Sequence, residues 1–141
     1  MSWRRIRSVG RRQRDRGAAA VEFALIVPLL SLFLLGIIDF GRLWYTQINL
    51  TEAAREGARL ESLGSSQVYS QTVAGATGFT GLTIYINGTK YTSDPGMPIP
   101  CPVGTNANVR VVSTGFTFTL AALTGIGPIT LAGTAVIPCG G

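Results

Sequence analysis

The chain has 141 residues, enough for one modest domain, and a formal net charge of +5. Seven arginines and one aspartate lie in residues 1–17, whereas five basic and six acidic residues follow from Ala18 onward. We therefore expect no nucleic acid partner, because a nucleic-acid-binding domain carries its cations on a folded face. The chain has no histidine, which excludes His-based triads and His-rich metal sites, and we expect no cofactor, no metal and no enzymatic activity.

The first predicted element is a polar, arginine-rich leader over residues 1–17, followed by residues 18–38, which are apolar except for Glu22 and Ser31. As a helix these 21 residues span about 31 Å, close to the hydrocarbon thickness of a bilayer. A buried helix of a soluble protein is the alternative, but so small a chain has no core that could surround it. We predict a single transmembrane helix over residues 18–41. The preceding arginines place its N-terminus in the cytoplasm and residues 64–141 outside.

The position of the small residues relative to the apolar run is unusual for an exported protein. A secretory signal peptide carries its small-residue cleavage site after the apolar run. Here the small cluster, Gly17 to Ala20, comes before it. Cleavage at this cluster would leave the apolar helix on the mature protein.

Helical periodicity continues over residues 42–63, which we predict to be an amphipathic extension of the same helix. Small and apolar residues share one face, and polar or charged residues share the other: Leu43, Leu50, Ala53, Ala54, Gly57 and Ala58 against Asn49, Glu52, Arg55, Glu56 and Arg59. We expect one helix from about Ala18 to Leu63, with Gly64 as its C-cap. Trp44 and Tyr45 lie where the membrane interface is expected. Asp39 and Arg42 either pair at the outer membrane edge or are both solvated.

Residues 64–141 are rich in Gly, Thr, Ser and β-branched residues, which indicates short strands. Asn87-Gly88 between two β-prone runs predicts a hairpin. Alternation over residues 108–120 changes parity near Gly115, which predicts a bulge, and residues 129–137 alternate again. The fold class is therefore α+β: a long N-terminal helix, inner half transmembrane and outer half amphipathic, with a small C-terminal antiparallel β domain packed on the outer half.

The two cysteines, Cys101 and Cys139, both lie in the part predicted to be outside the membrane. A sparse, even pair in an exported domain indicates one disulfide in an oxidising compartment. Two unpaired, small core residues are the alternative.

The leader junction reads Arg16-Gly17-Ala18-Ala19-Ala20-Val21-Glu22-Phe23 and resembles the processing site of type IV prepilins. The resemblance implies that a membrane-embedded prepilin peptidase cuts between Gly17 and Ala18, making Glu22 the fifth mature residue. A carboxylate inside an apolar segment is costly unless it is paired, protonated or at the interface. The new ammonium group of Ala18 could pair with Glu22 of a neighbouring subunit and fix the stagger between helices. Alternatively, Glu22 reaches the cytoplasmic headgroups from an uncut anchor.

Three further blocks, AVEFALIVP (20–28), GIIDFGR (36–42) and AAREGAR (53–59), are similar to TadE-like pseudopilins of tight-adherence (Tad, type IVb) pilus systems. The resemblance implies a minor pilin or pseudopilin that works with other pilins and the Tad secretion platform. It implies a place in the cell membrane or in an extracellular pilus. The competing hypothesis is an uncleaved, signal-anchored protein whose outer domain binds a ligand or mediates adhesion. A catalytic outer domain is a third and weaker hypothesis.

Overall fold

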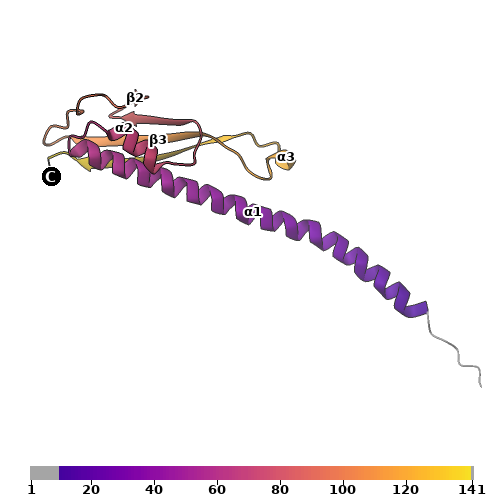
Figure 1. The fold of residues 1–141 in the computed structure, drawn as a ribbon. Coiled ribbons are helices and arrows are strands. Elements are labelled where there is room, and N and C mark those ends of the chain that lie inside the picture. The colour runs from indigo at the N-terminus through magenta and orange to yellow at the C-terminus, as the bar shows by residue number, and fades with distance from the viewer. Residues whose placement is uncertain (1–9, 141) are drawn as a thin grey trace, which may run out of the picture. The chain divides into compact units, whose positions relative to one another are not determined.

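The computed structural model describes the backbone of residues 10–140 and the side chains of residues 17–121 and 124–140. Most of the predicted leader, residues 1–17, therefore lies outside the described residues. The elements in chain order are α1 (Gly10–Ser62), α2 (Val68–Gly75), β1 (Leu82–Ile86), β2 (Thr89–Tyr91), β3 (Asn106–Phe116), α3 (Ala121–Thr124) and β4 (Ile129–Pro138) (Figure 1). The chain divides into two compact units, Met1–Ile38 and Asp39–Gly141, which are described separately below.

The long helix α1 contains all the described residues of the first unit and continues into the second. It begins at Gly10, eight residues before the predicted start at Ala18, because arginine and glutamine are good helix formers and extend the helical run. At the other end the prediction of Gly64 as the cap is confirmed. Gly64 has φ +68°, and its N–H donates to the carbonyl of Glu61 at 2.9 Å. The N–H of Ser65 donates to the carbonyl of Leu60 at 2.9 Å. This pair of hydrogen bonds is the Schellman motif.

The second unit contains a four-stranded antiparallel sheet in the order β2-β1-β3-β4. The predicted hairpin is confirmed: β1 and β2 are joined at Asn87 and Gly88, which have φ of 49° and 83° as a tight hairpin turn requires. The predicted bulge is also confirmed, because the β3–β4 register shifts between Thr114 and Phe116, on either side of Gly115. The α+β fold class predicted from sequence is correct.

Two short helices were not predicted, and the expectation of strands alone after Gly64 was wrong for Val68–Gly75 and Ala121–Thr124. The sequence of α2 is rich in β-branched residues, which favour strands in isolation. Tertiary contacts overrule that preference. Val68 is buried in the core, and the N–H of Ser70, in the first turn, donates to the Asp94 carboxylate at 3.0 Å. An anion at a helix N-terminus satisfies free N–H groups and favours the helix dipole.

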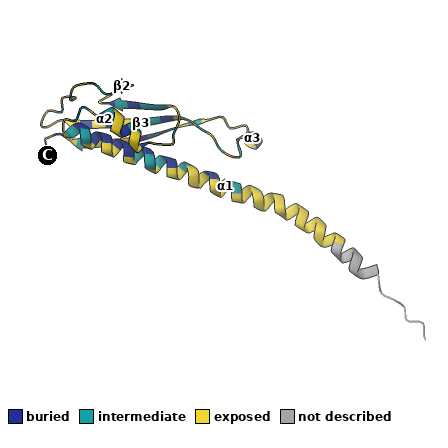
Figure 2. Cartoon of the chain, in the orientation of Figure 1, coloured by how far each residue is buried: buried dark blue, intermediate teal, exposed yellow. Residues whose placement is uncertain are grey.

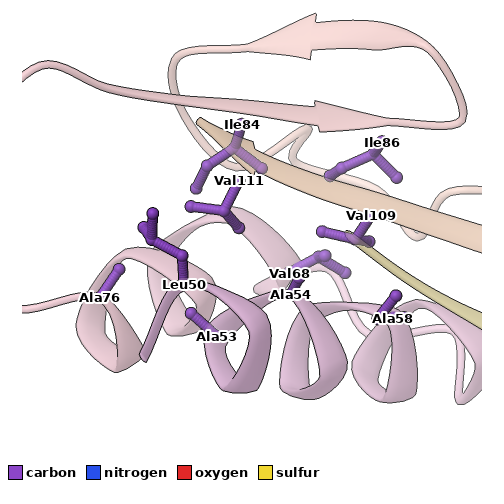
Figure 3. Close-up of a cluster of buried hydrophobic side chains, with 11 residues drawn as sticks. Leu50, Ala53, Ala54, Ala58, Val68, Ala76, Ile84, Ile86, Val109 and Val111 are labelled. Atoms are coloured by element: carbon purple, nitrogen blue, oxygen red, sulfur yellow. The ribbon is translucent and has the colours of Figure 1, made fainter. Parts of the chain in front are cut away.

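The hydrophobic core of the second unit lies between the outer part of α1 and one face of the sheet. The predicted apolar face of the helix is confirmed as the buried face, whereas the charged residues Glu52, Arg55 and Arg59 are exposed. The buried apolar side chains from helix and sheet are Leu50, Ala53, Ala54, Ala58, Val68, Ala76, Ile84, Ile86, Val109, Val111 and Ala135. Figure 3 shows Leu50 directed toward Val111 and Ile84 of the sheet. The small residues of α1 therefore serve contact with the chain's own sheet.

Candidate functional site

The predicted processing junction lies within α1, so its backbone is helical on both sides of Gly17. Gly17, Ala18 and Glu22 are all exposed, and a Cβ added at Gly17 would meet no atom within 4 Å. The structure thus leaves the Gly17–Ala18 bond and the Glu22 carboxylate accessible from outside the chain. Glycine also lowers helix stability by about 1 kcal/mol relative to alanine, which makes Gly17 a weak point in the helix.

The apolar stretch after the junction has nothing packed against it within its own unit. Among the described residues one helical stretch is long and apolar enough to cross a membrane, and it begins at Gly17. Its large side chains are exposed, including Phe23, Leu30 and Phe33, and Figure 2 shows this part of α1 as exposed. Length, composition and exposure together make the helix compatible with single-pass membrane anchoring.

Asp39, the residue directly after the apolar run, binds a loop that is distant in sequence. Its carboxylate accepts the N–H of Thr119 on Oδ1 at 2.9 Å and the N–H of Leu120 on Oδ2 at 3.1 Å. Arg42 contacts Asp39 at 3.4 Å and donates to Thr119 Oγ1 at 3.1 Å, with its guanidinium 5.6 Å from the centre of the Phe116 ring. We call these four residues, Asp39, Arg42, Thr119 and Leu120, the Asp39 clasp.

The sequence left open whether Asp39 and Arg42 pair or are both solvated, and the clasp decides between these alternatives. Asp39 is 4% exposed and paired with Arg42, so it is not simply solvated. The two backbone N–H donors, which no sequence pattern indicated, give the carboxylate three partners in all. On the exposed side of the same helical turn, Phe40 and Trp44 stack with their ring centroids 6.2 Å apart. Exposed aromatic side chains at this level are typical of a membrane interface.

A second group of contacts holds the sheet against α1 at unusually short range. Gly133 of β4 lies so close to the helix that an added Cβ would come within 3.0 Å of the backbone of Leu50 and Thr51. Gln47 Nε2 donates to the carbonyl of Ala132 at 2.8 Å. Glycine permits this approach because it carries no side chain. Neither Gly133 nor the neighbouring carbonyl was singled out by the sequence.

Glu61, in the last turn of α1, is fully buried. Its Oε1 accepts a hydrogen bond from Asn87 Nδ2 at 2.5 Å, while Oε2 has no protein partner. Burial raises the pKa of the Glu61 carboxyl above its ordinary value of 4.5, and the Asn87 hydrogen bond opposes that rise. Asn87 also accepts the N–H of Asn108 at 3.0 Å, so the end of α1 is tied to both the hairpin turn and β3.

The predicted cysteine pair is close enough in space to form a disulfide. Cys101 and Cys139 are joined with their Cα atoms 5.5 Å apart, within the usual range for a disulfide. Cys139 lies just after β4 and its N–H donates to the carbonyl of Thr105 at 2.9 Å. The structure therefore brings the two cysteines together, as the sequence predicted.

The second unit has shallow grooves on its surface. One groove of about 800 Å³ is open and lies between α1 and β4, with Glu52, Arg55 and Glu56 on its helix side. Within the part of the chain that the structure describes, no group of three or more Cys, Asp or Glu side chains could hold a metal ion.

Comparison with protein families matches residues 17–59 to the model described as TadE-like protein. The match begins at Gly17, covers the exposed apolar stretch, and ends near the last turns of α1. These are the segments whose motifs resembled TadE-like pseudopilins in the sequence. Comparisons with curated proteins and with solved structures gave no match. Over residues 17–59, which make up most of the long helix α1, this chain is similar to TadE-like proteins.

Proposed function

We propose that this chain is a minor pilin or pseudopilin of a Tad-type (type IVb) pilus, processed after Gly17 and assembled through α1. The observation that carries the proposal is the TadE-like match over residues 17–59, which begins at the glycine of the junction motif. Its partners are the prepilin peptidase, other pilins and the Tad secretion platform. The proposal assigns an assembly role and no enzymatic one, in keeping with a chain that has no histidine.

The contrast between the two parts of α1 supports assembly through its N-terminal part. The outer part of the helix buries its small residues against the chain's own sheet. Residues 18–38, in contrast, have large apolar side chains that nothing in their unit covers. Lipid can cover them before assembly and the helices of other pilins afterwards, since both offer apolar surface.

Processing requires a local change in the helix around Gly17. A peptidase binds an extended segment, so the helical backbone at Gly17 and Ala18 has to unwind before cleavage. The low helix propensity of glycine reduces the free energy of that step by about 1 kcal/mol compared with alanine. The peptidase would release residues 1–17 and leave Ala18 with a free ammonium group.

In the assembled state we propose that the ammonium of Ala18 pairs with Glu22 of a neighbouring subunit. Glu22 lies exposed at the start of the apolar stretch, where an ionised carboxylate without a partner is costly. Pairing would neutralise both charges and fix the axial position of one helix against the next.

The N-terminal residue of the protein extracted from membranes tests processing. Ala18 is the expected result when the peptidase is present, and an intact leader is expected when it is absent. Replacing Gly17 by a bulky residue such as phenylalanine should prevent the cleavage and leave membrane insertion unchanged, because the arginines and the apolar run are untouched. Normal maturation of Gly17→Phe would place the cleavage site elsewhere.

Co-purification with pilin partners tests the pairing of Glu22. Glu22→Ala should abolish association, because loss of one partner of a buried ion pair costs about 3–5 kcal/mol. Glu22→Gln should behave almost as badly, since it keeps the shape and removes the charge. Glu52→Gln, an exposed carboxylate farther along α1, is the matched control and should associate normally. Normal association of both Glu22 variants would rule out the pairing.

The second candidate is an uncleaved, signal-anchored protein with a binding or adhesive outer domain. The continuity of α1 through Gly17 favours it, because an uncut anchor needs no unwinding at the junction. The two candidates differ in the N-terminal residue and in the effect of Glu22→Ala. An uncut anchor would keep its leader and would insert at least as well without the carboxylate.

A further inference from the structure

The loop between β3 and β4, residues 117–128, has a composition unlike that of a solvent-exposed connection. It carries no charge, and no charged residue follows Arg110 in the whole chain. Ile126 is 51% exposed, and Phe118 and Leu120 are each only partly buried. The exposed Ile126 and the partly buried Phe118 and Leu120 give this uncharged loop an apolar surface.

The Asp39 clasp fixes where this loop lies along the chain's long helix. Two consecutive N–H groups of the loop, those of Thr119 and Leu120, are bound by the carboxylate of Asp39 at 2.9 and 3.1 Å. Asp39 directly follows Ile38, the last residue of the apolar run. The loop is therefore held at the level where the membrane helix is expected to leave the hydrocarbon. The exposed rings of Phe40 and Trp44 lie within about 8 Å of that level along the helix axis.

Five backbone N–H groups of the loop, those of Thr119, Leu120, Ala121, Thr124 and Gly125, have hydrogen-bond partners within the chain. Asp39 binds two of these groups. The N–H of Ala121 donates to the carbonyl of Phe118 at 3.1 Å. The N–H of Thr124 donates to the carbonyl of Leu120 at 3.0 Å, and the N–H of Gly125 donates to the carbonyl of Ala121 at 2.9 Å. Backbone groups that lack water as a partner must be satisfied internally, and this requirement grows toward the hydrocarbon. The helical turn of α3 and the Asp39 carboxylate meet part of this requirement for the loop.

We propose that residues 117–128 form a second membrane contact, inserted at the boundary between lipid headgroups and acyl chains. The partner is the lipid surface, and the inference rests on the proposed membrane anchoring of α1. Shallow insertion of a short apolar segment adds to the affinity of an anchored protein for the bilayer and limits the orientations of its outer domain. The Asp39 clasp then acts as the positioning element that holds the loop at the bilayer.

Variants of the full chain with one added cysteine, labelled with an environment-sensitive fluorophore and reconstituted into phosphatidylcholine vesicles, test the proposal, with the native cysteines kept as their disulfide. Ile126→Cys reports on the loop. Val136→Cys is the matched control, because Val136 has a similar exposure of 55% and lies on β4, opposite Asn108 near the start of β3. Phe33→Cys, in the apolar stretch and 65% exposed, reports on the anchor itself. Unsubstituted protein treated identically gives the background from the native cysteines.

Two quenchers distinguish lipid from water: iodide, present on both sides of the bilayer, and a spin label attached to the lipid acyl chains. We expect the labels at positions 126 and 33 to have blue-shifted emission, to lose iodide quenching and to be quenched by the spin-labelled lipid. The label at position 136 should have no blue shift in its emission, should be quenched by iodide and should not be quenched by the spin-labelled lipid. Near-ultraviolet circular dichroism identical to that of the unsubstituted chain shows that the variants are folded.

Each other outcome overturns the inference in a different way. Iodide quenching at position 126 equal to that at position 136, with position 33 in lipid, would refute the loop contact and leave the anchor standing. Position 33 exposed to iodide would refute membrane anchoring and the inference with it. A label at position 126 that is shielded from both quenchers would mean that a second protein copy covers the loop, and lipid is then the wrong partner.

Discussion

Gly133 offers a direct test of how the sheet is held on α1. In the structure an alanine Cβ at this position would lie within 3.0 Å of backbone atoms of Leu50 and Thr51, where it cannot be accommodated by rotating a side chain. Gly133→Ala must therefore move β4 away from the helix or distort the strand. Either change lengthens the hydrogen bond between Gln47 and the carbonyl of Ala132, which is 2.8 Å in the structure.

The expected cost can be worked out from this geometry. Overpacking of a core by added methyl or methylene groups costs about 1–3 kcal/mol, and contact with backbone places this case at about 3 kcal/mol. A domain the size of Asp39–Gly141 has a total free energy of unfolding of about 5–15 kcal/mol, so the loss is a large fraction. With a urea dependence of about 1–3 kcal/mol per molar, the unfolding midpoint should fall by about 1–3 M.

The assay is urea unfolding of the full chain in detergent micelles, followed by near-ultraviolet circular dichroism. Gly127→Ala is the matched control, because an added Cβ there meets no atom within 4 Å and its backbone does not require glycine. The urea midpoint of Gly127→Ala should differ from that of the unsubstituted protein by no more than an ordinary surface substitution changes it. A Gly133→Ala midpoint equal to that of Gly127→Ala would refute the close approach of β4 to α1.

Two further predictions concern single interactions in the second unit. Burial raises the pKa of Glu61, so its neutral form favours folding. The contribution of Glu61 to stability should be greatest below about pH 4.5 and should be lost as the pH rises through the raised value in the folded protein. Glu61→Gln should flatten this dependence in urea midpoints measured across acidic and neutral pH, and an unchanged slope would show that another group is responsible. For the cysteines, intact-mass analysis with thiol labelling of the unreduced, unfolded protein should find no free thiol. Cys139→Ser should lower the free energy of unfolding by about 4 kcal/mol, because the disulfide to Cys101 closes a loop with a sequence separation of 38 residues. Two alkylated thiols in the unsubstituted protein would exclude the disulfide.

Local sequence patterns were sufficient wherever a single segment specifies its own conformation. The 3.6-residue period of residues 42–63 predicted which face of α1 is buried, and Asn87-Gly88 predicted the hairpin, because only such residues readily take positive φ at both positions. The parity change near Gly115 predicted the bulge. The apolar run predicted a helix without cover inside its own unit, since no comparable apolar surface exists elsewhere in so short a chain.

The sequence did not predict the helix α2 or the burial of Glu61, for a common reason: the residues that stabilise each of them lie far away in the sequence. The helix α2 has residues that favour strands, and it is helical because Asp94 binds its first turn and Val68 enters the core. Glu61 has the appearance of one more solvated charge at a helix end, yet it is fully buried. In each case a contact over about 25 residues overrules the local preference.

For the candidate site, the sequence by itself determined the apolar helix and the charge asymmetry, and it predicted Gly17 and Glu22 as residues of a processing junction. Only the tertiary structure placed the β3–β4 loop on Asp39 and the backbone of β4 at Gly133 against α1. The physical reason is that amphipathic period and turn propensity are properties of consecutive residues. A carboxylate that accepts N–H groups 80 and 81 positions away, and a glycine needed for the close approach of two backbones, depend on how the whole chain packs.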